Sequence, residues 1–240
     1  FGIALATVTL PYLARQAAND SLDEFADTLD WSMKLVLLIA VPAAIGLIVL
    51  AEPLVATIFY GGVFTGDDVR MTALALQAFS VGLIGFSYVK ILAPAYFARE
   101  DTRTPVRIGL IALAVNFVLS VSLAWYLTRI GFAGTHAGLA LAISVAALLN
   151  AFLLYRGLRG EGVVRHGRGW AALLLRTAVA NVVMTAALVA LQRPLSWWLE
   201  SGIFDRVTWL AMAIVVAVAA YFAALFVLGM RTADFRLRQN

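Results

Sequence analysis

The sequence predicts an all-α fold, a polytopic transmembrane helix bundle with six full spans plus the end of a seventh. The first observation behind this prediction is composition. Of the 240 residues, 62% are hydrophobic and 13% are charged, against about 45–50% and about 25% in soluble domains. The second is the mean hydropathy of +0.90. The third is that the apolar runs are continuous rather than alternating, which predicts helices because backbone groups in lipid must be satisfied internally.

Six apolar stretches approach or exceed the roughly 20 residues that a membrane-crossing helix needs. Five of them contain no Asp, Glu, Lys or Arg, and Arg176 alone interrupts the other. In chain order the predicted spans are 35–51, 71–89, 108–128, 130–155, 169–192 and 207–230. A further apolar run, 1–14, lacks the charged region that begins a signal peptide. We interpret it as the end of a seventh span, in a fragment whose true N-terminus lies upstream.

The segment 16–34 carries five acidic residues before the first full span. Ser21 and Glu24 have the spacing of a capping box, and the apolar residues that follow Ser21 share one helical face. This pattern predicts an amphipathic helix at the membrane interface, before the chain enters the bilayer at Trp31. A solvated connector is the alternative interpretation.

The distribution of basic residues predicts the orientation. The net charge is +4 and the pI is about 9.7, but the basic residues stand at the ends of apolar runs, which indicates lipid headgroups rather than nucleic acid. Of the 18 Lys and Arg residues, twelve lie in one set of loops and four in the other. The positive-inside rule therefore predicts that the loops at Arg103 and Arg165, and the tail 231–240, are cytoplasmic.

Ionisable residues within spans are costly and indicate functional sites by default. Lys90 lies nine residues before Arg99, or about 13 Å along a helix, which is deep for snorkelling. We interpret Lys90 as a cation lining a hydrophilic cavity that receives an anionic group, with a structural Lys bonded to helix carbonyls as the alternative. Arg176 lies nearer the end of its span, where snorkelling to phosphates explains its charge.

The sequence carries no signature of an enzyme, a cofactor site or a metal site. It has no cysteine and two histidines, and it lacks the metalloprotease, nucleophile-elbow and phosphate-loop patterns. A membrane-embedded transferase acting on polyprenyl phosphates would need a carboxylate or His cluster, which the sequence does not suggest. A purely structural scaffold is a further alternative, and it would leave Lys90 unexplained.

The most distinctive segment is 90–106, KILAPAYFAREDTRTPV. A helix is predicted to end near Arg99, whose cation suits a helix C-terminus. Thr104 is predicted to cap the next helix, with Pro105 at its first position. Arg103 is predicted to face the headgroups.

This segment resembles the MurJ/MviN family of lipid II flippases, within the wider multidrug/oligosaccharidyl-lipid/polysaccharide exporter superfamily. The string LAPAYFAREDTRTPV is close to a family signature. Further similarities are FGIALATVTLP, FYGGVFT, SVGLIGFSYVKILAP, HAGLALAIS and AYFAALFVLG. The resemblance covers essentially the whole chain, and it implies the end of helix eight and helices nine to fourteen of a fourteen-helix, two-lobed transporter.

The resemblance also implies a division of the chain. Residues 1–157 are then second-lobe helices, 158–168 a cytoplasmic loop, 169–230 the C-terminal helix pair and 231–240 a cytoplasmic tail. The helix pair is implied to line a groove for a lipid tail. The main headgroup cavity is implied to draw its key residues from upstream of Phe1.

The function implied is a flippase that moves lipid II, the undecaprenyl-pyrophosphate-linked peptidoglycan precursor, across the bacterial inner membrane by alternating access. The implied partners are this lipid-linked precursor, membrane lipids and the missing N-terminal lobe, with no cofactor, metal or nucleic acid. We predict Lys90, Arg99, Arg103 and Arg176 as substrate-binding residues. The alternative is another exporter of the superfamily, an O-antigen-type flippase or a drug/cation antiporter, against which the long signature and the two extra helices argue.

Overall fold

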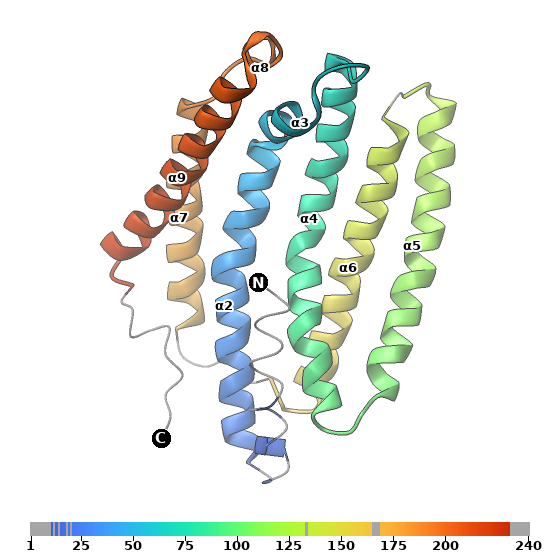
Figure 1. Cartoon of the computed structure of the whole chain (residues 1–240). Coiled ribbons are helices and arrows are strands. Elements are labelled where there is room, and N and C mark those ends of the chain that lie inside the picture. The colour runs from blue at the N-terminus through green and yellow to red at the C-terminus, as the bar shows by residue number, and fades with distance from the viewer. Residues whose placement is uncertain are drawn as a thin grey trace.

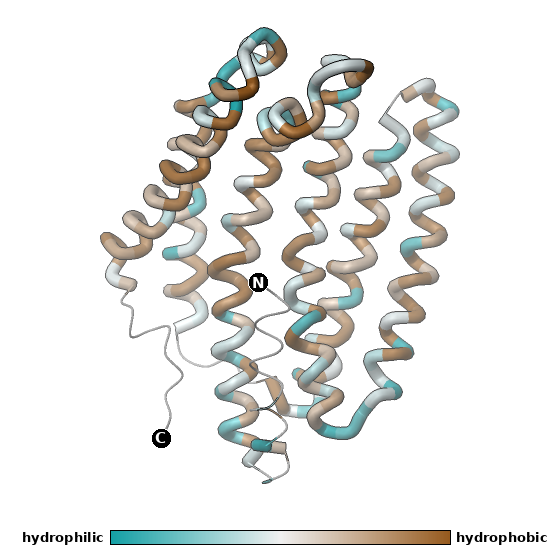
Figure 2. The backbone as a smooth tube through the Cα atoms, viewed as in Figure 1, coloured by the Kyte–Doolittle hydropathy of each residue, from teal (hydrophilic) through white to brown (hydrophobic). Residues whose placement is uncertain are grey.

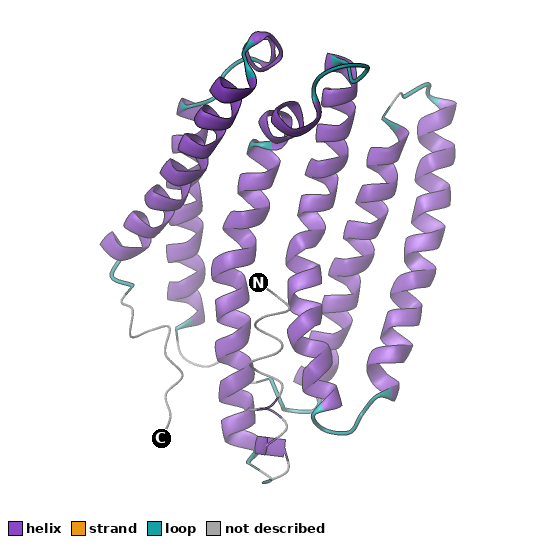
Figure 3. Cartoon of the chain, viewed as in Figure 1, coloured by secondary structure: helices purple, strands orange, loops and turns teal. Residues whose placement is uncertain are grey.

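A computed structural model describes residues 11, 13, 15–17, 19, 21–132, 134–164 and 169–230. Within these residues, six helices are long and apolar enough to cross a membrane, which confirms the predicted fold class. Figures 1 and 3 show them as a bundle of long rods with short connections. The long helices are α2 (Leu22–Val49), α4 (Gly66–Phe97), α5 (Arg103–Arg129), α6 (Thr135–Gly160), α7 (Trp170–Ala190) and α9 (Ile203–Val227). Two short helices, α3 (Ala51–Phe59) and α8 (Leu195–Glu200), lie at one end of the bundle. The predicted seventh span, 1–14, lies almost entirely outside the described residues.

The long helices alternate in direction, so their connections gather at two ends (Figure 1). Hydrophobic residues dominate the middle of the rods, and hydrophilic residues gather toward their ends (Figure 2). The α4–α5 turn lies at the same end as the start of α2, as the orientation prediction requires. Residues 158–160 of the predicted cytoplasmic loop 158–168 belong to the end of α6, and its residues 165–168 lie outside the described residues, as does the tail 231–240.

Helix α2 lies between the α7–α9 pair on one side and α4, α6 and α5 on the other (Figure 1). The N-terminal half of α2, from Phe25 to Ala40, packs into a core with α4 and α6. Its C-terminal half joins a second core with α3, the start of α4, α7, α8 and α9. Helix α2 is therefore the element that connects the two parts of the bundle.

Helices α4 and α6 pack most closely. A Cβ added to Gly85 would lie 2.6 Å from the carbonyl carbon of Ala147, and one added to Gly82 would lie 2.7 Å from the Cα of Ser144. The Ser144 hydroxyl donates to the carbonyl of Ala78 at 2.7 Å. Small residues and hydroxyl bonds of this kind hold helices together in lipid, where apolar packing has little driving force.

Two helix starts differ from prediction. Helix α2 is continuous from Leu22 into the membrane, so the separate interfacial helix is wrong, and Ser21 makes no side-chain capping bond. Helix α5 begins at Arg103 after the cap residue Thr102, not after Thr104. The predicted end of the preceding helix near Arg99 is confirmed, since α4 ends at Phe97.

Gly61 and Gly62 form a tight turn between α3 and α4. Both residues have positive φ, 150° and 58°, which glycine adopts without strain. Residues Gly61 and Phe64 form an isolated antiparallel bridge across this turn. Helix α3, which precedes the turn, was not predicted.

Candidate functional site

An apolar groove of about 360 Å³ lies between α2, α7 and α9. Helix α7 contributes Met184 and Leu188 to the groove, and both residues also belong to the buried core that α7 shares with α2, α3 and α9. The rim is open to the surroundings, because Val218 and Phe222 of α9 are 50% and 56% exposed. The lining residues are Leu38, Ile39, Pro42, Ala43, Gly46, Leu47, Leu50, Leu54, Met184, Leu188, Ile214, Ala217, Val218, Tyr221 and Phe222.

Gly46 keeps part of this groove empty. A Cβ built on Gly46 would meet nothing within 4 Å, although the residue lines the groove. A side chain at this position would therefore project into open space. The groove is thus a preformed apolar slot with room for an apolar chain.

A hydrogen bond crosses the end of the groove at Leu38. The Tyr221 hydroxyl of α9 donates to the backbone carbonyl of Leu38 in α2 at 2.8 Å. Tyr221 is 3% exposed, so this bond is shielded from both lipid and water.

At the end of the bundle that carries α3 and α8, Arg206 in the first turn of α9 is buried against these two short helices. Its guanidinium donates to the carbonyls of Ala56 at 3.3 Å, Tyr60 at 3.5 Å and Leu199 at 3.0 Å. It also lies 4.9 Å from the centre of the Tyr60 ring. Because these carbonyls belong to the C-terminal ends of helices, their partial negative charge compensates the buried cation.

At the end of the bundle where α7 begins, a charged cluster joins α2 to the start of α7. Asp30 accepts from the Trp170 indole N–H at 2.6 Å, and its other oxygen lies 2.6 Å from the Lys34 ammonium. Lys34 also lies 5.8 Å from the centre of the Trp170 ring. The buried carboxylate is thus paired with a cation and a donor, as a charge near lipid requires.

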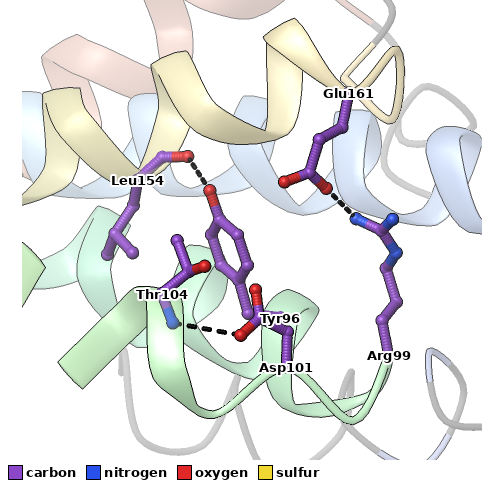
Figure 4. Close-up of polar contacts among 6 residues, drawn as sticks. All are labelled: Tyr96, Arg99, Asp101, Thr104, Leu154 and Glu161. Atoms are coloured by element: carbon purple, nitrogen blue, oxygen red, sulfur yellow. Dashed lines mark hydrogen bonds and ion pairs between the residues drawn. The ribbon is translucent and has the colours of Figure 1, made fainter. Parts of the chain in front are cut away.

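The α4–α5 turn forms a second polar cluster (Figure 4). Arg99 forms an ion pair with Glu161, just beyond the end of α6. The Tyr96 hydroxyl donates to the carbonyl of Leu154 in α6 at 3.0 Å. Asp101 accepts the backbone N–H of Thr104 at 3.0 Å, and hydrogen bonds from the Thr104 side chain and backbone hold the pKa of its carboxyl below the usual value.

The four predicted binding residues do not gather at one point. Lys90 lies on an exposed face of α4 and makes no hydrogen bond or ion pair with another described residue. Arg99 and Arg103 flank the α4–α5 turn, with Arg99 engaged by Glu161 and Arg103 exposed. Arg176 is half-buried on α7, where its guanidinium lies beside Gly229 at the end of α9.

The family model described as lipid II flippase MurJ matches residues 1–204. The chain belongs to the MurJ family. A probable lipid II flippase MurJ from Vibrio cholerae is 42% identical over 236 residues, which cover 98% of this chain and 44% of that protein. The corresponding protein from Haemophilus influenzae is 40% identical over 96% of this chain and 45% of its own length. The lipid II flippase MurJ of Burkholderia cenocepacia is 35% identical over 99% and 45%. The chain therefore spans less than half the length of these relatives.

The MurJ fold is also seen in a solved structure. A lipid II flippase MurJ in an inward closed conformation superposes with a TM-score of 0.73 at 20% identity, covering 95% of this chain and 43% of that one. At this identity the likeness concerns the fold. The family match favours the MurJ interpretation over the other exporters of the superfamily, and the six long apolar helices agree with a multi-pass membrane protein.

Several polar contacts of this MurJ chain were not predicted from sequence. Trp170 opens an apolar span directly after a basic loop, a position typical of interfacial aromatic residues, and this signal could have marked it. Tyr221 is a lone hydroxyl in an apolar run, and a buried Tyr usually finds a hydrogen-bond partner. Neither signal identifies the hydrogen-bond partner, because Asp30 lies 140 residues from Trp170 and Leu38 lies 183 residues from Tyr221.

Proposed function

We propose that this chain supplies the C-terminal helices of a flippase for a lipid-linked peptidoglycan precursor in the bacterial inner membrane. The observation that carries the proposal is the apolar groove between α2, α7 and α9, in a chain of the MurJ family. Relatives that are longer than this chain carry the name lipid II flippase. The headgroup cavity would be completed by helices from the rest of the protein.

In this proposal the groove holds the apolar tail of the substrate. Its α2 wall runs from Leu38 to Leu50, which is about 18 Å along a helix. A polyprenyl segment can enter through the open rim between α2 and α9 without leaving the lipid phase. Because the slot is preformed, little conformational entropy is lost in shaping it around the chain.

Lys90 is the residue of this chain that we propose for the headgroup. An ammonium facing hydrocarbon at that depth costs about 2.5–3.5 kcal/mol on insertion scales, so an exposed Lys90 favours a water-filled cavity beside α4. Its charge attracts a pyrophosphate without requiring a fixed geometry. Arg103 and Arg176 are proposed to contact anionic groups near the inner surface, and Arg99 to do so when its ion pair with Glu161 opens.

The groove is tested in cells depleted of their own flippase and supplied with the full-length protein. Gly46→Trp fills the slot and is expected to abolish rescue. Gly109→Trp is the matched control, because a Cβ on Gly109 in α5 likewise meets nothing within 4 Å but lies away from the groove. Equal rescue by both variants, at wild-type membrane levels, would refute the tail site.

The headgroup role is tested separately at Lys90. Lys90→Ala is expected to reduce flipping of the lipid-linked precursor in reconstituted vesicles several-fold, at a normal protein level. Lys90→Arg is expected to retain part of the activity because it keeps the charge. If Lys90→Met inserts normally and flips at the wild-type rate, the ammonium takes no part in transport.

A further inference from the structure

Pro42 lies inside α2, four residues after Leu38. In an α-helix the carbonyl of residue 38 accepts from the N–H of residue 42, and proline has no N–H. The Leu38 carbonyl is therefore left without its helical donor, in a span where water does not reach. An unsatisfied carbonyl in that environment is costly.

The donor that replaces it comes from another helix. The Tyr221 hydroxyl of α9 donates to this same Leu38 carbonyl at 2.8 Å. Pro42, Leu38 and Tyr221 all line the apolar groove. A defect in one wall of the groove is thus repaired by a side chain from the opposite wall.

The bond matters because α9 packs mainly on α7 and only sparsely on α2. The groove itself separates α2 from α9, so few apolar contacts hold the two walls at a fixed spacing. Apolar contacts can also be exchanged for lipid contacts at little cost. A hydrogen bond to a carbonyl that has lost its helical donor cannot be exchanged in that way.

We propose that Pro42 and Tyr221 form a latch that positions α9 against α2 and fixes the inner end of the groove. Pro42 creates the acceptor and Tyr221 is the positioning residue that occupies it. The latch closes the groove toward the inner surface, while the rim at Val218 and Phe222 stays open. The inference concerns the groove that the proposed function uses, but its test measures stability and distance, so the two can fail independently.

A double-mutant cycle tests the latch in the purified full-length protein. Tyr221→Phe is expected to lower the Tm, because it leaves the Leu38 carbonyl without a donor. Pro42→Ala restores the N–H that this carbonyl lacks. In the Pro42→Ala background, Tyr221→Phe should therefore lower the Tm by less than half as much. Tyr126→Phe is the matched control, since Tyr126 is 56% exposed on α5, and it should leave the Tm unchanged in both backgrounds.

Spin-label distances supply a readout that a purely local stability effect would not move. This chain contains no cysteine; in a full-length protein with any other cysteine replaced, labels are placed at Glu24→Cys and Phe226→Cys, which are exposed near the start of α2 and the end of α9. Tyr221→Phe should broaden this distance distribution, and adding Pro42→Ala should narrow it again. A reference pair at Glu24→Cys and Arg103→Cys should not change.

The latch is overturned by either of two results. One is a Tyr221→Phe effect on the Tm that is equal in the Pro42 and Pro42→Ala backgrounds, or absent from both. The other is an unchanged Glu24–Phe226 distribution in Tyr221→Phe protein.

Discussion

Gly85 is the position where one added methyl group should disturb the bundle most clearly. Its Cβ would lie 2.6 Å from the carbonyl carbon of Ala147 and 2.7 Å from the backbone nitrogen of Leu148. Both atoms belong to the backbone of α6, so no side-chain rotation relieves the contact. Gly85→Ala therefore requires α4 and α6 to separate locally by about 1 Å, the difference between 2.6 Å and an ordinary contact distance.

The magnitude follows from two opposing effects. Overpacking a close interface costs about 1–3 kcal/mol, and replacing Gly by Ala inside a helix returns about 0.5–1 kcal/mol. The difference is a net loss of about 0–2.5 kcal/mol, centred near 1 kcal/mol. In a domain of 150–250 residues, 1 kcal/mol lowers the Tm by about 2–4 °C.

The assay is thermal unfolding of the full-length protein in one detergent, with Gly109→Ala as the control. A Cβ on Gly109 meets nothing within 4 Å, so this variant should match or slightly exceed the wild-type Tm. The reasoning fails if Gly85→Ala is as stable as Gly109→Ala. Such a result would mean that α4 and α6 are not in backbone contact at Gly85.

Two further predictions concern the loops. Intact cells should protect Arg103→Cys from a membrane-impermeant maleimide and expose Val63→Cys to it; the opposite pattern would reverse the orientation. Asp101 has a lowered pKa in the folded protein, so its stabilising effect is complete above its unfolded pKa of about 4 and is lost as the pH falls through the folded pKa. The Tm of Asp101→Asn should therefore lie below that of the wild type at pH 7, with the gap closing in acid; a gap independent of pH would contradict this account.

The membrane spans could be predicted from sequence because the bilayer imposes a simple rule of length and hydropathy. The residues at which helices begin were predicted less well than the spans themselves. The acidic residues from Asp23 to Asp30 belong to α2 itself instead of a separate helix, and Asp23 and Glu24 in its first turn interact favourably with the helix dipole. At the start of α5, Thr102 and Thr104 were both chemically suitable caps, and the choice is tied to Asp101, which accepts the next two free N–H groups.

The functional features also differ in how far the sequence predicts them. Lys90 is visible in sequence because a cation stands out in an apolar run. The groove is not visible, because most of its lining residues are ordinary apolar residues, and those of α2 and α3 lie more than 120 residues from those of α7 and α9. The contribution of Pro42 was not predicted, since the sequence does not show which side chain replaces the lost hydrogen bond.

Helix α2 accepts hydrogen bonds from both parts of the bundle. From α4, the Gln77 amide donates to the carbonyl of Ile48 at 3.1 Å and the Tyr88 hydroxyl to that of Met33 at 3.2 Å. From the other side come the bonds of Tyr221 and Trp170. In membranes such interhelical bonds contribute about 0.6 kcal/mol each on average, and up to about 1.7, so separating either neighbour from α2 breaks several of them at once. We therefore expect α2, α4, α6, α7 and α9 to move largely as one body, and the rocking of the proposed alternating-access mechanism to take place between this body and the rest of the full-length protein.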